Sequence, residues 1–223
     1  MKKIILLLIP VLLLSCKKDD GSPKVENITK GSKWNLKIGS SYAQVYTQLQ
    51  QLGTEKKFQD LSVVKQQPVT KPEELQNRLA YYRSVNVENT MGTLDWALIG
   101  IGQEKISTIY ATNETLKGAA KWPSDLPDET AIHPDDPLNT AYTRLVAIFQ
   151  LPKYKGQYRL SLSDKPLDKP FDPNMVNYDE WAFTFHVDIG NTLKSGRSSV
   201  RLYFKNGKLD KIQHTYEEFD VYI

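Results

Sequence analysis

Two parts of this chain repeat one pattern of apolar and polar residues, and this repetition limits the fold more than any other feature. Each part begins with apolar residues spaced three or four positions apart, as on one face of an α-helix. Each continues with segments that alternate apolar and polar residues, as in strands buried on one side. The helical positions are Tyr42, Val45, Leu49 and Leu52 in the first part, and Leu138, Tyr142, Leu145 and Phe149 in the second.

The two parts align at three places, where residues 45–49, 61–63 and 101–109 correspond to 141–145, 160–162 and 204–212. The last pair are predicted hairpins, and Asn206-Gly207 in the second is the strongest short hairpin signal in the chain. We therefore expect an α+β fold of tandem helix-plus-antiparallel-meander units, α-β-β-β-β twice, with the helices packed on one face of the sheet. The expected units are residues 34–112 and 135–223, joined by a linker at 113–134 that is rich in Pro, Asp and Ala.

The N-terminus carries a secretion pattern. Lys2 and Lys3 precede an apolar run at 4–14 that is too short to span a bilayer, and the run ends at Ser15-Cys16. This stretch resembles the lipobox of bacterial lipoproteins. The resemblance implies that residues 1–15 are a removed signal peptide, that Cys16 is lipidated, and that 16–33 form a lipidated tether.

The residues after the cysteine bear on localisation. Lys17, Lys18, Asp19 and Asp20 resemble the export signal of Bacteroidetes-type lipoproteins that reach the cell surface. A solvated spacer between membrane and domain is the alternative. We expect a protein that is anchored by lipid in the outer membrane. The sequence does not decide between the inner and the outer leaflet, and the outer leaflet would expose the protein on the cell surface.

The charge gives no support for a nucleic-acid-binding protein, and the cysteine content excludes a protein stabilised by intrachain disulfides. Removal of residues 1–15 takes two of the 29 basic residues and leaves 27 against 26 acidic ones, so no basic excess favours a nucleic-acid partner. Cys16 is the only cysteine, so no intrachain disulfide can form. The fold must therefore be stabilised by apolar burial.

The order of helix and meander, together with Gly39-Ser40-Ser41 before the first helix and Val45 and Leu49 within it, resembles β-lactamase-inhibitor-protein-like domains. It is also similar to the small lipoproteins that help to assemble outer-membrane β-barrels. The resemblance implies a sheet that presents a shaped surface to another protein. The chain departs from the family at Gly53, which comes one turn late.

A catalytic or metal site should leave a recognisable group of residues, and the sequence shows none. His133, His186 and His214 form no HExxH pattern, and nucleophile-elbow and phosphate-loop patterns are absent from the sequence. His133 lies beside Asp135 and Asp136, where a helix-capping turn and a metal site are the two interpretations. We expect no enzyme activity, no metal and no cofactor.

An exposed sheet face is the better prospect for binding. If helices cover one face, the polar positions of the alternating strands lie on the other, where Tyr and Arg are typical of interaction sites; a merely solvated face is the alternative. Trp34 and Trp122 are either core residues or rings that stack on carbohydrate. The expected protein-binding residues are Arg159, Thr184, His186, Arg201, Tyr203 and Gln213.

These observations favour a non-catalytic envelope lipoprotein that binds another envelope or extracellular protein through its exposed antiparallel sheet face. The alternative is a surface lipoprotein that binds glycan or another small ligand in a nutrient-capture system. A hydrolase whose site the sequence does not reveal is the third hypothesis.

Overall fold

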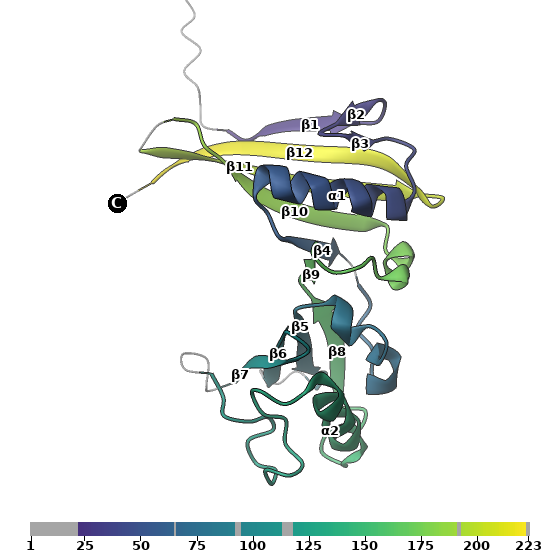
Figure 1. The fold of residues 1–223 in the computed structure, drawn as a ribbon, viewed down its shortest axis with the longest axis vertical. Helices are drawn as coiled ribbons and strands as arrows, with labels where there is room; N and C mark the ends of the chain where they lie inside the picture. Colours follow the sequence, from purple (N-terminus) through teal and green to yellow (C-terminus); the bar gives the residue numbers. More distant parts are fainter. Residues whose placement is uncertain (1–21, 65, 92–94, 113–117, 191–192, 222–223) are drawn as a thin grey trace, which may run out of the picture.

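The computed structural model describes residues 22–64, 66–91, 95–112, 118–190 and 193–221. These residues form mostly antiparallel sheets with two α-helices, 21% helical and 42% strand, which confirms the expected α+β class. Two lobes are stacked along the long axis, each with one sheet, one α-helix and its own core (Figure 1).

The upper lobe contains a six-stranded sheet in the order β1-β12-β11-β10-β4-β9, and helix α1 (Tyr42–Lys56) packs on one face of it. Tyr42 of α1 lies 4.1 Å from Phe204 and 5.4 Å from Trp181, measured between ring centroids. A two-stranded β2-β3 ribbon precedes the helix. The strands are β1 (Lys24–Ile28), β2 (Ser32–Lys33), β3 (Leu36–Lys37), β4 (Asp60–Val64), β9 (Lys165–Pro166), β10 (Glu180–Val187), β11 (Lys194–Lys205) and β12 (Lys208–Asp220).

The lower lobe contains a four-stranded sheet in the order β7-β6-β5-β8, covered by helix α2 (Leu138–Gln150). Its strands are β5 (Ser84–Asn89), β6 (Trp96–Gly102), β7 (Lys105–Ala111) and β8 (Tyr158–Ser163). Short 3-10 helices follow β4 at η1 (Pro72–Leu75) and η2 (Leu79–Tyr81), and precede β10 at η3 (Pro173–Asn177).

The expected tandem arrangement of two consecutive units is not confirmed. The first helix and β4 join the strands β10, β11 and β12 of the last part of the chain, because β4 pairs with β10. The second helix and β8 join β5, β6 and β7 of the first part, because β8 pairs with β5. Each half of the chain thus gives its helix and first strand to the three-stranded meander of the other half.

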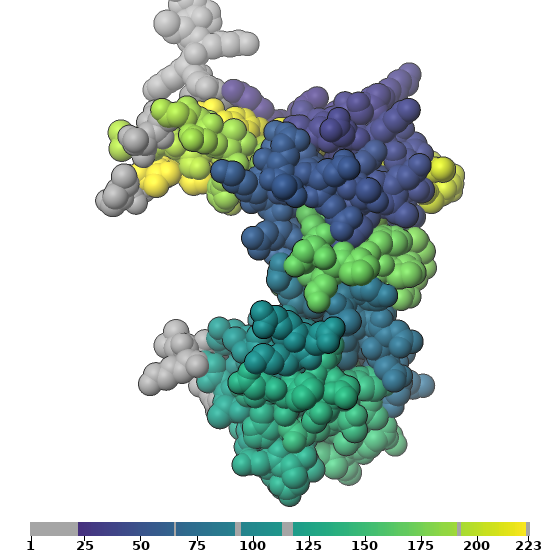
Figure 2. Space-filling model, viewed as in Figure 1, coloured from purple at the N-terminus to yellow at the C-terminus, as the bar shows by residue number. Residues whose placement is uncertain are grey.

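One continuous stretch of chain links the lobes. β8 pairs with β5 in the lower lobe, and after Asp164 the chain continues as β9, which pairs with β4 in the upper lobe. Asp164 has a φ of 56°, the left-handed conformation typical of a bulge. Figure 2 shows the lobes joined along one side and separated by a hollow on the other.

The ends of α1 follow from local chemistry. Ser41 accepts a hydrogen bond from the Gln44 amide, and the Gln44 side chain accepts one from the Ser41 amide, which is a capping box. The helix ends three residues beyond Gly53, at Lys56, and Lys57 supplies the left-handed C-cap with a φ of 59°. Gly53 is instead a point of close approach, since a Cβ there would lie 2.7 Å from Cδ1 of Leu167.

The described part of the expected linker, residues 118–134, belongs to the lower core. Trp122 and Ile132 are buried, and their backbones exchange two hydrogen bonds of 2.7 and 2.8 Å. The segment runs along the outer edge of β7, where the Ala119 amide donates to the Ile109 carbonyl at 2.7 Å. At the other end of β7, the amide of Ile106 donates to the backbone carbonyl of Asp136, just after this segment, at 2.9 Å. These bonds cover the edge of the four-stranded sheet.

Candidate functional site

Helix α1 covers one face of the six-stranded sheet, and we call the opposite face, on which no helix of the described residues packs, the outer face. Along β10, Trp181, Phe183 and Phe185 are buried against α1, so the alternate residues Thr184 and His186 point outward and are exposed. The alternation that the sequence shows in this strand therefore sets the two faces as expected.

The structure brings five of the six expected binding residues together on this face. Ala182 pairs with Arg201, which pairs with Gln213, and Thr184 pairs with Ser199 in the same register. The outer-face residues that were expected from the sequence are Thr184, His186, Arg201, Tyr203 and Gln213.

Arg159 lies elsewhere. It is on β8 of the lower sheet, where its Nη2 is 2.8 Å from Oε2 of Glu88 on β5. The sequence placed it with the other five because its strand alternates in the same way, and alternation gives the face of a strand without giving its sheet.

Polar contacts order the outer face. The exposed guanidinium of Arg201 is ion-paired with the buried carboxylate of Glu180, and the hydrogen bond to Glu180 raises the pKa of Arg201. Tyr203 donates to Gln213 at 3.3 Å, and Lys211 Nζ lies 4.0 Å from the centroid of the Tyr203 ring. Side chains fixed by such contacts lose less conformational entropy when a partner binds.

Part of β10 has no neighbouring strand on one side. β4 pairs only with Glu180–Ala182, and in the described part of the chain no strand continues this pairing along residues 183–187 (Figure 1). We call residues 183–187 the open edge. The Asp179 carbonyl accepts from the Phe204 amide at 2.8 Å and so points to β11. Because backbone groups point to alternate sides along an antiparallel strand, those of Thr184 and His186 point to the open edge.

A groove of about 510 Å³ runs beside the open edge. Phe58 forms its floor with Phe183, since their rings stack with centroids 4.6 Å apart. The groove is open and mixed in polarity, which suits an extended peptide better than a small molecule. It is lined by Lys56, Lys57, Phe58, Gln59, Asp60, Ser62, Ala182, Phe183, Thr184, Phe185 and His186. The sequence could not reveal it, because the groove depends on where β4 stops pairing with β10.

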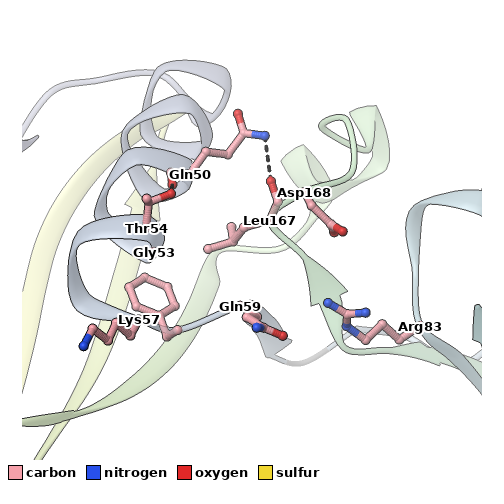
Figure 3. A pocket seen from close by; sticks show the side chains of 9 residues that line it. Gln50, Gly53, Thr54, Lys57, Gln59, Arg83, Leu167 and Asp168 are labelled. Atoms are coloured by element: carbon pink, nitrogen blue, oxygen red, sulfur yellow. Dashed lines mark hydrogen bonds between the residues drawn. The ribbon is translucent and has the colours of Figure 1, made fainter.

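A second hollow of about 740 Å³ lies between the C-terminal half of α1, the chain after β9 and Arg83 of the lower lobe (Figure 3). The Gln50 amide nitrogen donates to the Leu167 carbonyl at 2.7 Å across its rim. Arg83 is engaged by Asp60 at 2.6 Å. Thr54, the one hydroxyl among the residues that line it, donates to the Gln50 carbonyl. The Thr54 hydroxyl is thus bonded to its own helix rather than to a base.

Ionisable residues lie close together where the two lobes meet, and they are hydrogen-bonded to one another. The buried carboxylate of Asp172 accepts from Arg78 Nε at 3.2 Å and from the Tyr82 hydroxyl at 2.8 Å. The ammonium of Lys165, fully buried, donates to the Tyr46 hydroxyl at 2.6 Å. Burial lowers the pKa of Lys165 to about 8 and raises the pKa of Tyr46 and Tyr82. The Asp172 contacts with Arg78 and Tyr82 join the two lobes, whereas the bond between Lys165 and Tyr46 lies within the upper lobe.

Two of the three histidines, His133 and His214, are engaged in structural contacts, whereas His186 is exposed on the outer face. The His133 amide donates to the Asp136 carboxylate at 2.7 Å, and Asp136 also pairs with Arg144 of α2, as expected for a turn that leads into a helix. Helix α2 itself begins after Pro137, with no side-chain cap. His214 lies on the core side, 3.0 Å from the Ser198 hydroxyl, and burial lowers its pKa. Among the described residues, no group of three or more His, Cys, Asp or Glu side chains could hold a metal ion.

Trp34 and Trp122, for which core packing and carbohydrate stacking were the two interpretations, pack against protein. Trp122 is buried, with its ring centroid 5.8 Å from that of Tyr154. Trp34 is half-buried between Phe185 and His214, at 5.4 and 4.7 Å. Core packing, the interpretation that the sequence favoured over carbohydrate stacking, describes both positions.

The predicted lipidation at Cys16 and the export signal at residues 17–20 lie outside the described residues. Within residues 22–221 as described, no helix has the length and apolar character needed to cross a bilayer.

Comparison with known proteins gave no match to a protein-family model, to a curated protein or to a solved structure.

Proposed function

We propose that this protein is a non-catalytic lipoprotein, anchored in the bacterial outer membrane through Cys16, that binds another envelope or extracellular protein at its six-stranded sheet. The partner lays an extended segment along the open edge and rests side chains on the outer face. An inhibitor-like or assembly-factor-like role is the form of this activity that the family resemblance implies.

The observation that carries the proposal is the free backbone of the open edge beside an ordered polar face. An extended peptide gains main-chain hydrogen bonds at a strand edge, and neighbouring side chains supply specificity. Here the Thr184 and His186 backbones supply the bonds, and Arg201 and Tyr203 offer the residue types that are common in binding hot spots.

We also infer that the two halves of the chain are copies of one helix-plus-four-strand unit. In the folded protein the helix and first strand of each copy pack with the last three strands of the other copy. The support is the shared element order and the reciprocity of the exchange, since each first strand pairs with the other half's meander. Exchange of identical elements between copies is a low-cost rearrangement.

The test is capture of the partner from detergent-solubilised outer membranes with edge variants. Thr184→Pro removes one amide donor that points away from β11, whereas Thr184→Ala keeps it. We expect wild-type protein and Thr184→Ala to retain a stoichiometric protein partner and Thr184→Pro to lose it. A partner that Thr184→Pro retains at wild-type levels would contradict binding at this edge.

A further inference from the structure

The end of the sheet where β11 begins and β12 ends carries exposed apolar side chains. Leu193, Phe219 and Val221 are 64%, 39% and 37% exposed, and we call these three residues the sheet tip. The Val221 amide donates to the Leu193 carbonyl at 2.9 Å, so the two chain segments are held side by side at this end. Exposed apolar side chains that gather at one end of a sheet favour an interaction site there.

The described N-terminus lies at the same end of the sheet. β1 pairs antiparallel with β12, and Lys24, its first residue, is opposite Tyr216. Phe219 lies three residues further along β12 than Tyr216, so the sheet tip extends about 10 Å beyond the start of β1. The segment that connects the fold to Cys16 therefore begins beside the strand that carries the tip.

The length of this segment limits how far the fold can stand from its anchor. Five residues, 17–21, separate Cys16 from Ser22, and even a fully extended chain spans only about 21 Å across these six Cα–Cα steps. With Cys16 acylated, as the proposed function requires, Ser22 stays within that distance of the bilayer surface, and Lys24 at the start of β1 follows two residues later. The tip lies closer still whenever the sheet points toward the membrane.

We propose that the sheet tip inserts into the headgroup region of the membrane that holds the lipid of Cys16. The inference rests on the proposed lipid anchor and adds a second, protein-mediated contact. Apolar side chains at the interface add to the binding that acyl chains provide, and a two-point contact fixes the direction of the sheet above the membrane.

The contact is apolar in character. The charges near the tip show no basic excess, and Arg197 is ion-paired to Glu217 across β11 and β12. The other charged residues there are the basic Lys24 and Lys194 and the acidic Asp188, Glu218 and Asp220. Without a basic excess the contact gains little from anionic lipids, so it should persist at high salt.

A single introduced thiol tests the proposal, because Cys16 is the only native cysteine and is blocked by acylation. We would label Phe219→Cys with an environment-sensitive fluorophore in the full-length acylated protein, reconstituted in vesicles of phosphatidylethanolamine and phosphatidylglycerol that contain nitroxide-labelled lipid. The matched control is Val176→Cys, 46% exposed and in η3, away from the tip. We expect at least threefold stronger quenching at position 219 than at 176, unchanged in 0.5 M salt.

The outcomes separate the two proposals. Acylated, vesicle-bound protein whose label at 219 is quenched no more than the label at 176 overturns the tip contact alone. Protein that mass spectrometry shows to lack acyl chains, and that stays free of vesicles, overturns the lipid anchor and the tip contact together.

Discussion

The two sheets of this protein treat their edges differently. In the lower lobe, residues 118–137 run along β7 and hydrogen-bond to it, so that the Ile106 amide has a partner in Asp136. In the upper lobe, β4 stops pairing at Ala182 and leaves the rest of β10 open. Unpaired strand edges promote association with other chains, and proteins usually cover them. A fold that covers one edge and leaves another open beside a groove points to the open edge as the place where a partner binds.

The covered edge gives the largest expected effect. Trp122 anchors the covering segment in the lower core, so Trp122→Ala should lower the free energy of unfolding by about 3–5 kcal/mol. Denaturant unfolding measures the loss, and Trp34→Ala, at a half-buried ring, serves as the control with a smaller loss. A change below about 1 kcal/mol for Trp122→Ala would show that the segment does not depend on this anchor.

Proline substitutions compare an open edge with a paired strand directly. Ser199 lies in β11 between Thr184 and Thr215, so Ser199→Pro disrupts a strand that is paired on both sides and should cost about 3 kcal/mol or more. Thr184→Pro deletes an amide that has no strand partner and should cost about 1 kcal/mol or less. Equal losses in thermal or denaturant unfolding would mean that the Thr184 amide is paired in solution.

The titration of Lys165, on β9 near the place where the lobes meet, tests whether the two lobes unfold together. The pKa of Lys165 is lowered from 10.5 to about 8, so above pH 8 the unfolded chain binds more protons at this residue than the folded chain does. Stability should therefore rise between pH 8 and pH 9.5, by about 1–2 kcal/mol, before the raised pKa of Tyr46 and Tyr82 reverses the trend near pH 10.

Unfolding curves recorded with probes in each lobe measure this rise. The gain should be equal in both lobes, and Lys165→Met should abolish it. A rise confined to the upper lobe would indicate that the lobes unfold independently.

Local patterns predicted much of this fold. The alternation through Trp181, Phe183 and Phe185 set the faces of β10, and Asn206-Gly207 forms the turn between β11 and β12 with positive φ at both residues. These features depend on neighbours in sequence, and the sequence therefore reports them.

The pairing between strands that are distant in sequence could not be predicted from such local patterns. The joining of β4 to β10 and of β8 to β5 depends on pairs such as Val64–Glu180 and Ser84–Ser163, which are far apart in sequence, and no periodicity encodes the choice of partner. Arg159 was assigned to the same face as Arg201 for this reason. The open edge and its groove follow from the pairing, so they were visible only in the structure.

Amide hydrogen exchange tests the difference between the edges most directly. Exchange resolved by NMR in the native protein should be slow at Ile106, whose amide is bonded to Asp136, and slower by at least a hundredfold than at Thr184 and His186. Protection of Thr184 and His186 equal to that of Ile106, in the protein without a partner, would contradict an open edge and the binding role built on it.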